Sequence, residues 1–526
     1  MMSNPVYLIG LDAFDIVLLK RWAGEGHLPH FSRLLNDASQ GRLVSSTSVM
    51  QGSIWPTFAT ACEPGEHGMY YMLQVEPRWH RLKRVRATDS KCLPFWSCLS
   101  SAGKTSLVID VPKLALQPDS SSVQIVEWGA MDHYASFMTN PKDLGRQILG
   151  QFGRHILYDD LVEPRSPAAY VELLDGLVDG ARLRTRLGAA LLQEHRPDLF
   201  VSVYAESHPA GHYFWKFMES QDGGQADASL SDAILKVYQS IDESIGELIE
   251  SHGEHANIIV FSGHGMVRDD YPRWLLEELL VRMGLTVKVG AGPQIADPQR
   301  AGTDVDGAER VDAVSAANRN AGHPRRRFKD LEVWLRKMAN DYVLPRGVQR
   351  RLWIRNMQKN IDFGRTRAWA LPTDLQGFIR INLEGREDGG IVSARDYDRV
   401  VDDIATTLQS LRNKDNDEPV VEGVIKTRSL YDGAPNVDLL PDICVAWKNA
   451  PVRTVCSDRL GEFDVPDGGI VRSGNHRLEG FFFAQGPDIA PGRDHGDRNL
   501  TSIGPTALNL LKIEPPARLK ADPIPL

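Results

Sequence analysis

Short apolar runs alternate with amphipathic stretches along most of this chain. Runs rich in β-branched and aromatic residues occupy residues 6–11, 106–110, 123–127, 199–204 and 257–262. Turn residues and then a stretch of helical periodicity follow these runs. This rhythm is typical of βαβ units, in which parallel strands form a sheet that helices cover on both faces. The pattern predicts an α/β fold, a three-layer α/β/α sandwich around a mostly parallel sheet.

The pattern breaks in the middle of the chain. From about residue 288 to residue 322 the sequence is rich in Gly, Asp, Ala and Asn with little apolar periodicity, and a basic helical stretch follows at 325–358. We therefore expect a core in two parts, 1–285 and 366–526, with an inserted subdomain at 286–365 that is partly mobile and partly helical. Short strands are expected at 367–371 and 377–382. The main sheet is expected to resume at 442–447 and 480–484.

Composition narrows the class of protein. The 526 residues are 42% hydrophobic and 25% charged, which is ample for a globular core. A net charge of -9 argues against binding to a nucleic acid polymer, since phosphate backbones are held by clustered Lys and Arg. No apolar run approaches the length of a membrane span, so we expect no membrane association. The five scattered cysteines are typical of reduced thiols in a cytoplasmic protein.

Candidate chemistry gathers where strands end or begin. Asp12 follows the first strand, His208 and His212 follow another, His264 follows a third, and His476 precedes a late strand. Taken singly, such residues more often cap a helix or bond to a backbone carbonyl. Because several of them fall at strand ends of one sheet, they are expected to converge on one crevice. Imidazole and carboxylate ligands together favour zinc, with manganese as the alternative.

These residues stand in motifs that resemble a known family. In chain order the motifs are IGLDAF (9–14), LPHFSRL (28–34), WPTFAT (55–60) with PGEHG (64–68), ESHPAGHYFW (206–215), FSGHGM (261–266), GNHRLEG (474–480) and PTALNLL (505–511). The chain is similar in these motifs to the alkaline phosphatase superfamily, specifically its branch of type I phosphodiesterases and nucleotide pyrophosphatases. The resemblance covers most of the chain.

The resemblance implies a metal-dependent hydrolase of phosphoric esters, either a phosphodiester or a nucleotide pyrophosphate, with a small phosphorylated substrate. In that family two divalent metals lie at the carboxyl ends of the sheet, and a Ser or Thr at a helix start attacks phosphorus. By resemblance, Asp12 and His264 would bind one metal. His212 and His476 would bind the other.

Two positions depart from the family pattern. His208 stands where the family has Asp, and Gly263 stands where the family has Asp before the histidine matched by His264. One site thereby becomes a three-histidine set of His208, His212 and His476, which suits a single zinc ion with an open position. The other site loses a carboxylate, so it is weak, empty or completed by another acid such as Asp269 or Glu206. Both one and two ions remain open.

The nucleophile departs as well. An ungapped alignment places the family's Ser or Thr on Gln51, which cannot act as an alkoxide. We predict Ser53 as the nucleophile, with Ser48 and Thr47 as reserves. Ser53 is equally interpreted as the N-cap of the following helix, in which case metal-bound water would attack. Two other classes stay open, namely a phosphoryl or other group transferase on the same fold and a non-catalytic homologue that binds ligand.

Overall fold

A computed structural model describes residues 3–44, 50–117, 121–131, 134–159, 161, 164, 166–219, 228–290, 358, 360–466 and 472–526. Most of the expected insertion at 286–365 lies outside these residues, and so do Thr47 and Ser48. The division at residues 285 and 365 therefore stays a prediction. Among the helices in this described part, none combines the length and apolarity needed to span a bilayer.

The main sheet has nine strands in the order β20-β2-β19-β9-β1-β8-β5-β6-β7. Their bounds are β1 (Val6–Leu11), β2 (Ser39–Val44), β5 (Ser106–Ile109), β6 (Ser122–Val126), β7 (Met138–Asn140), β8 (Leu199–Tyr204), β9 (Asn257–Ser262), β19 (Gly480–Gln485) and β20 (Asp494–Asn499). Only β19 and β7 run antiparallel to their neighbours. The register pairs Leu11 with Tyr204, so β1 and β8 end side by side.

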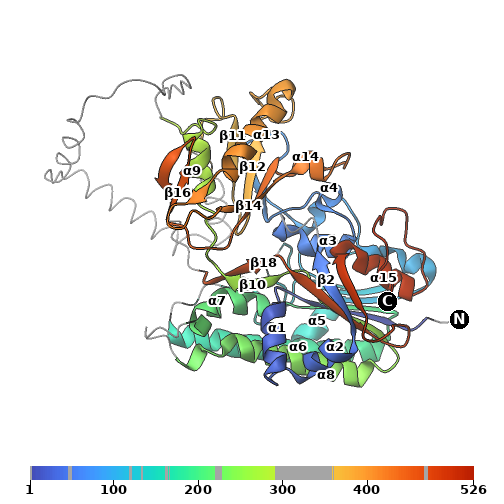
Figure 1. Cartoon of the computed structure of the whole chain (residues 1–526). Helices are drawn as coiled ribbons and strands as arrows, with labels where there is room; N and C mark the ends of the chain where they lie inside the picture. Colours follow the sequence, from blue (N-terminus) through green and yellow to red (C-terminus); the bar gives the residue numbers. More distant parts are fainter. Residues whose placement is uncertain are drawn as a thin grey trace, which may run out of the picture.

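Helices bury both faces of this sheet (Figure 1). Side chains alternate along β1, so that Ile9 and Leu11 pack on one face while Val6 and Leu8 pack on the other. The first face is covered by α1 (Ile16–Gly24), α2 (Pro29–Asp37), α5 (Leu144–Gln151), α6 (Pro167–His195), α7 (Ser207–Glu219) and α8 (Ala233–His252). The second face is covered by α3 (Ile54–Thr60) and α15 (Ile503–Leu510). The predicted three-layer α/β/α sandwich is confirmed.

A smaller sheet lies beside the main one, at the upper left of Figure 1. It has the strand order β11-β12-β15-β14, with β11 (Ala368–Leu371), β12 (Gly377–Ile381), β14 (Val421–Lys426) and β15 (Ile443–Trp447). Its apolar core includes residues from α9 (Leu275–Arg282) and α13 (Ala394–Gln409). The remaining short elements are α4 (Pro64–His67), α14 (Thr427–Leu430), β3 (Leu73–Val75), β4 (Leu82–Arg84), β10 (Gly265–Arg268), β13 (Arg412–Asn413), β16 (Thr454–Ser457), β17 (Gly461–Asp464) and β18 (Gly474–Arg477).

One strand was assigned to the wrong sheet. The run at 442–447 was expected in the main sheet, yet β15 pairs with β12 and β14 in the smaller one. An apolar run shows that a strand is buried, but its pairing partner is set by tertiary packing. The edge strand β20 and its neighbour β2 were not predicted because their exposed positions are polar and leave little apolar alternation.

A buried ionic cluster fixes the start of β15. Both carboxylate oxygens of Asp442 accept hydrogen bonds of 2.7 Å from Arg386, and they accept two more from the Ile381 amide and the Tyr397 hydroxyl. Burial by itself would raise the pKa of Asp442, but Arg386 outweighs it, and the pKa falls from 3.8 to about 2. The charged form of Asp442 is therefore more stable in the folded protein than in the unfolded chain.

We expect Asp442→Asn to lower the free energy of unfolding at pH 7 by about 3 kcal/mol, because it removes one of the two carboxylates that the buried Arg386 guanidinium binds. Since the folded pKa lies below the unfolded one, this stabilisation is complete above about pH 4 and is lost as the pH falls toward 2. Urea unfolding at pH 7 and pH 3 measures both effects, with the exposed Asp458→Asn as the control. Equal stability of the two variants at pH 7 would contradict the interpretation.

Candidate metal centre

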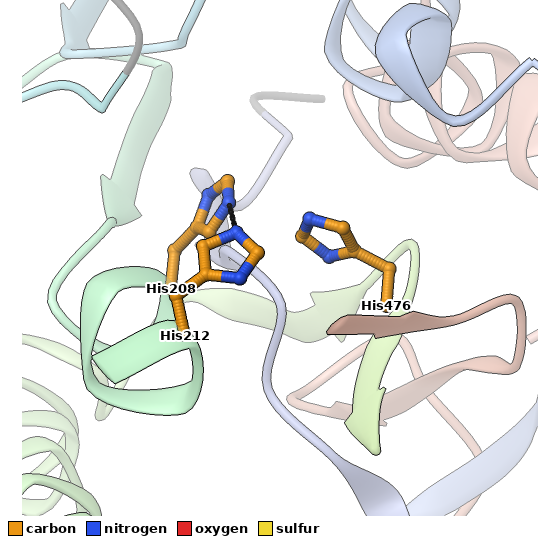
Figure 2. Close-up of side chains that lie close together, drawn as sticks. All are labelled: His208, His212 and His476. Carbon is orange, nitrogen blue, oxygen red and sulfur yellow. Dashed lines mark hydrogen bonds between the residues drawn. The ribbon is translucent and has the colours of Figure 1, made fainter. Parts of the chain in front are cut away.

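Helix α7 presents two histidines to one point. It begins directly after β8, where the Ser207 hydroxyl donates a hydrogen bond of 2.7 Å to the backbone carbonyl of Asp12. Four-residue spacing places His208 and His212 on the same side of the helix. Their Nε2 atoms lie 3.0 Å apart, and Figure 2 shows the two rings facing the same space. The structure thus confirms the helical pairing that the sequence predicted.

The other nitrogen of each ring faces an acceptor. His208 Nδ1 lies 2.7 Å from Asp12 Oδ2, and His212 Nδ1 lies 2.8 Å from the carbonyl oxygen of Gly474. We therefore assign an Nδ1 proton to both rings in the tautomer that would bind a metal. This leaves a lone pair on each Nε2, and the two lone pairs face a common space, which is the usual arrangement of metal-binding histidines.

Asp12 links the centre to the sheet. Its Oδ1 accepts a hydrogen bond of 2.7 Å from the Trp55 indole and lies 3.8 Å from His264 Nε2, while Oδ2 faces His208. Burial would raise the pKa of this carboxyl, but the neighbouring histidine and its hydrogen bond outweigh burial, and the pKa is about 2. Asp12 is thus a charged, buried carboxylate with a donor on each oxygen.

His264 and His476 come from a separate two-stranded ribbon. His264 directly precedes β10, and His476 lies in β18 opposite Met266. The His476 ring is 4.8 Å from the rings of His208, His212 and His264, measured between centroids, and Figure 2 shows it facing the pair on α7. The Nδ1 atoms of His264 and His476 are buried and have no hydrogen-bond partner within the described chain.

The cluster has the properties of a metal site. Burial, followed by repulsion from neighbouring cations and histidines, lowers the pKa of His212 and His476, and burial lowers the pKa of His264 to about 3. Neutral imidazoles keep the lone pairs that a metal needs. The candidate ligand atoms of His208, His212 and His476 all lie within 4.8 Å of one another. Nitrogens on one tetrahedral zinc ion are about 3.3 Å apart, so the donor set fits with small ring movements.

Two glycines allow the ribbon to reach the helix. A Cβ atom at Gly474 would lie 2.2 Å from the carbonyl oxygen of Gly211 in α7, and one at Gly211 would lie 2.6 Å from Met266 in β10. Only glycine fits at these contacts without displacing the backbone. Because β18 lies this close to α7, the Gly474 carbonyl reaches His212 and the His476 ring reaches the pair.

The place of the expected second carboxylate is filled. A Cβ atom at Gly263 would lie 2.5 Å from Cγ2 of Ile54, which is itself 3% exposed. The two acids that could have compensated are held elsewhere: Glu206 accepts a 3.0 Å bond from Arg184, and Asp269 accepts a 2.6 Å bond from Arg273. Asp12 and His264 therefore lie beside the three-histidine set, and neither Glu206 nor Asp269 completes a second metal site with them.

Ser53 is turned away from the cluster. Its side chain is buried at the N-cap position of α3, and its hydroxyl donates a hydrogen bond of 2.6 Å to the Met50 carbonyl. Gln51 instead lines the small pocket beside the histidines. That pocket is formed by Gln51, Gly52, Tyr71, Met72, Lys113, Tyr134, His208, Asp374, Arg472 and His476. The sequence had offered Ser53 both as nucleophile and as N-cap.

Sequence reasoning missed the cations of this site. Lys113 reaches the pocket from the turn after β5 and donates a 3.1 Å bond to the Gly52 carbonyl. Arg472 lies two residues before β18 and pairs with Asp374 at 3.8 Å. Neither residue stands in a recognisable motif. The only available signal was that Lys113 follows a predicted strand.

Another histidine late in the chain, His495, lies elsewhere. His495 is in the edge strand β20, where its Nε2 is 3.4 Å from the Ser39 hydroxyl. It lines no part of the small pocket. His476 is therefore the late histidine that joins the cluster.

Comparison with known proteins places this geometry in a family. Residues 6–446 match the sequence profile of type I phosphodiesterase / nucleotide pyrophosphatase. A search of curated proteins gives no match. Phosphonoacetate hydrolase from Sinorhizobium meliloti 1021 is a similar solved structure, at 12% identity over 97% of this chain and 96% of that one, with TM-scores of 0.51 with phosphonoformate and 0.52 with phosphonoacetate. Murine ectonucleotide pyrophosphatase / phosphodiesterase 5, in complex with AMP, gives 12% identity, 98% and 96% coverage and a TM-score of 0.48.

We expect the close packing of Ile54 against Gly263 to affect the stability of substituted proteins. Gly263→Ala should lower the free energy of unfolding by about 1–3 kcal/mol, because the added methyl group overlaps Ile54. In an Ile54→Ala background the same change should cost at least about 1 kcal/mol less, since the space is then free. Urea unfolding of the four proteins gives this coupling. Gly24→Ala is the control, since a Cβ there meets nothing within 4 Å. Additive costs would show that Ile54 does not fill the position.

Proposed function

Because the chain belongs to the type I phosphodiesterase / nucleotide pyrophosphatase family, we propose that its histidine cluster holds one divalent cation and hydrolyses a small phosphoric ester there. The family acts on phosphodiester and pyrophosphate bonds, and this protein is a phosphoester hydrolase. The observation that carries the proposed site is the convergence of three imidazoles, two of which direct an Nε2 lone pair into one space.

We assign the ligands to His208, His212 and His476. Asp12 serves as the outer partner that orients His208, because its two oxygens already accept from Trp55 and His208. Zinc is the proposed ion, since an all-imidazole set favours zinc over manganese. A zinc ion bound there would act as a Lewis acid that polarises a phosphoryl oxygen. One ion rather than two is proposed because Ile54 fills the space beside Gly263.

The remaining polar groups bind and orient the ester. Lys113 and Arg472 place positive charge in the small pocket, where it offsets the charge of a phosphoryl group. Gln51 offers an amide in the same pocket. Ester hydrolysis consumes one water molecule: an oxygen bonds to phosphorus, the P–O bond to the alcohol breaks, and a proton ends on the leaving oxygen.

Two nucleophiles follow from the sequence, the Ser53 hydroxyl and water. The burial of Ser53 and its hydrogen bond to Met50 favour water. We also propose a cytoplasmic, reducing location, because all five cysteines are free in the structure.

Metal binding tests the ligand assignment. We expect purified protein to bind about one equivalent of zinc. His212→Ala should weaken the zinc affinity by more than the roughly 10–100-fold that loss of an outer partner causes, whereas Asp12→Asn should stay within that range. Elemental analysis and competition with a chromophoric chelator give these affinities. Turnover of bis-p-nitrophenyl phosphate is measured in parallel.

The exposed His27→Ala is the matched control and should change neither metal content nor turnover. Unchanged zinc affinity in His212→Ala would overturn the site. Zinc binding at full affinity with no turnover of any phosphoric ester would instead favour the non-catalytic alternative.

Substitution of Ser53 separates the two nucleophiles. If water attacks, Ser53→Ala should keep kcat within a few-fold and lower the free energy of unfolding by about 1 kcal/mol, because one buried hydrogen bond is lost. Thr57→Ala, which removes another buried hydroxyl of α3, is the control. A fall in kcat of a thousandfold or more, in a folded and zinc-loaded Ser53→Ala protein, would identify Ser53 as the nucleophile.

A further inference from the structure

A large cavity adjoins the small pocket that contains the histidines. Its volume is about 430 Å³, within the range of about 300–1,000 Å³ that is typical of small-molecule sites. Tyr71, Met72, Asp374 and Arg472 line both spaces, so the two lie next to each other at these residues. Tyr213 also lines the large cavity and directly follows His212 on α7. A ligand with one end at the histidines therefore has room for its other end here.

The large cavity is lined mainly by apolar side chains, most of them aliphatic and three of them aromatic (Tyr71, Tyr213 and Trp274). They come from several parts of the fold, including the β3 strand, the segments after β6 and α5, α9 and β11. Representative residues are Leu73, Met131, Leu157, Leu276, Ala370 and Leu371. Transfer of apolar surface from water to such a lining is favourable, at about fourfold in affinity for each buried methylene.

The charges of the two spaces differ. The ionisable residues of the large cavity are three carboxylates (Asp159, Glu277 and Asp374) and two guanidiniums (Arg273 and Arg472). Each guanidinium is ion-paired, Arg273 with Asp269 at 2.6 Å and Arg472 with Asp374 at 3.8 Å. Lys113 lines only the small pocket. The carboxylates are paired as well, Asp159 with Arg154 at 3.5 Å, Glu277 with Lys288 and Asp374 with Arg472. Lys113 thus favours an anionic group beside the histidines, whereas in the large cavity a second anionic group would meet guanidiniums that are already ion-paired.

We propose that the ester group of the substrate is uncharged and apolar, an alkyl or aryl alcohol, and that it occupies the large cavity while the phosphoryl group lies at the histidines. The proposal rests on the hydrolase function above and narrows its substrate class. A nucleotide pyrophosphate fits less well, because its second phosphate would enter a mostly apolar space whose two guanidiniums are already ion-paired.

Binding measurements test this assignment without depending on turnover. Butyl, hexyl and octyl phosphate and adenosine 5′-monophosphate are titrated calorimetrically into zinc-loaded protein. We expect Kd to fall more than tenfold from butyl to octyl phosphate, and octyl phosphate to bind more tightly than the nucleotide. A Kd that does not depend on chain length, or tighter binding of the nucleotide, overturns the proposal.

A cavity-filling variant supplies the structural check. Ala370 is half-buried in the cavity wall, so Ala370→Phe should remove the chain-length dependence while butyl phosphate binds within a few-fold of normal. Ala168→Phe, on the exposed start of α6, is the matched control and should keep the dependence. Retention of the full dependence in a folded Ala370→Phe protein places the alkyl chain elsewhere and overturns the proposal.

The outcome also separates this proposal from the hydrolase function. Chain-length dependence without ester turnover supports the cavity assignment and counts against hydrolysis. Turnover of bis-p-nitrophenyl phosphate with a flat alkyl series supports hydrolysis and overturns the apolar substrate class.

Discussion

The candidate site depends on one buried carboxylate. Asp12 directly follows the central strand β1, and its charge is stabilised by donors from two other segments, Trp55 on α3 and His208 on α7. A buried charge without such partners costs several kcal/mol, so the partners and the carboxylate fix one another's positions. The contact with Asp12 favours the His208 tautomer that carries its proton on Nδ1, and the Nε2 atom of that ring faces His212. A single electrostatic requirement at the end of β1 thus orients the first ligand of the proposed metal.

The second constraint is steric. The cluster joins α7, which follows a strand of the main sheet, to the ribbon of β10 and β18, and the two meet across Gly211 and Gly474. Behind α7, the guanidinium of Arg184 binds Asp110, the Gly129 carbonyl and Glu206, which ties the ends of β5, β6 and β8 together. Close backbone contact and a buried ion network leave the helix start little freedom. The rings of His208 and His476 are therefore placed by rigid elements rather than by loops.

The packing around the site also bears on the positions where this chain departs from the pattern of its family. Where the sequence resemblance predicts an acid in place of Gly263, Ile54 fills the adjoining space, and beside Gln51, where it predicts the nucleophile, Ser53 bonds to the Met50 carbonyl. At both positions, neighbouring side chains are packed or bonded in a way that accommodates the residue found in this chain. The cavity beside the pocket is lined mainly by apolar side chains, and its two guanidiniums, Arg273 and Arg472, are ion-paired.

The sequence by itself determined the layered sheet and the histidine pair. The apolar runs and the four-residue spacing of His208 and His212 report local burial and helix geometry, which depend on near neighbours in the chain. Tertiary structure alone decided that β15 joins the smaller sheet, that Asp12 bonds to His208, and that Ser53 faces Met50. Each of these depends on contacts between distant segments or on the direction of one side chain. The physical reason is that periodicity shows which residues are buried, whereas only packing decides what they are buried against.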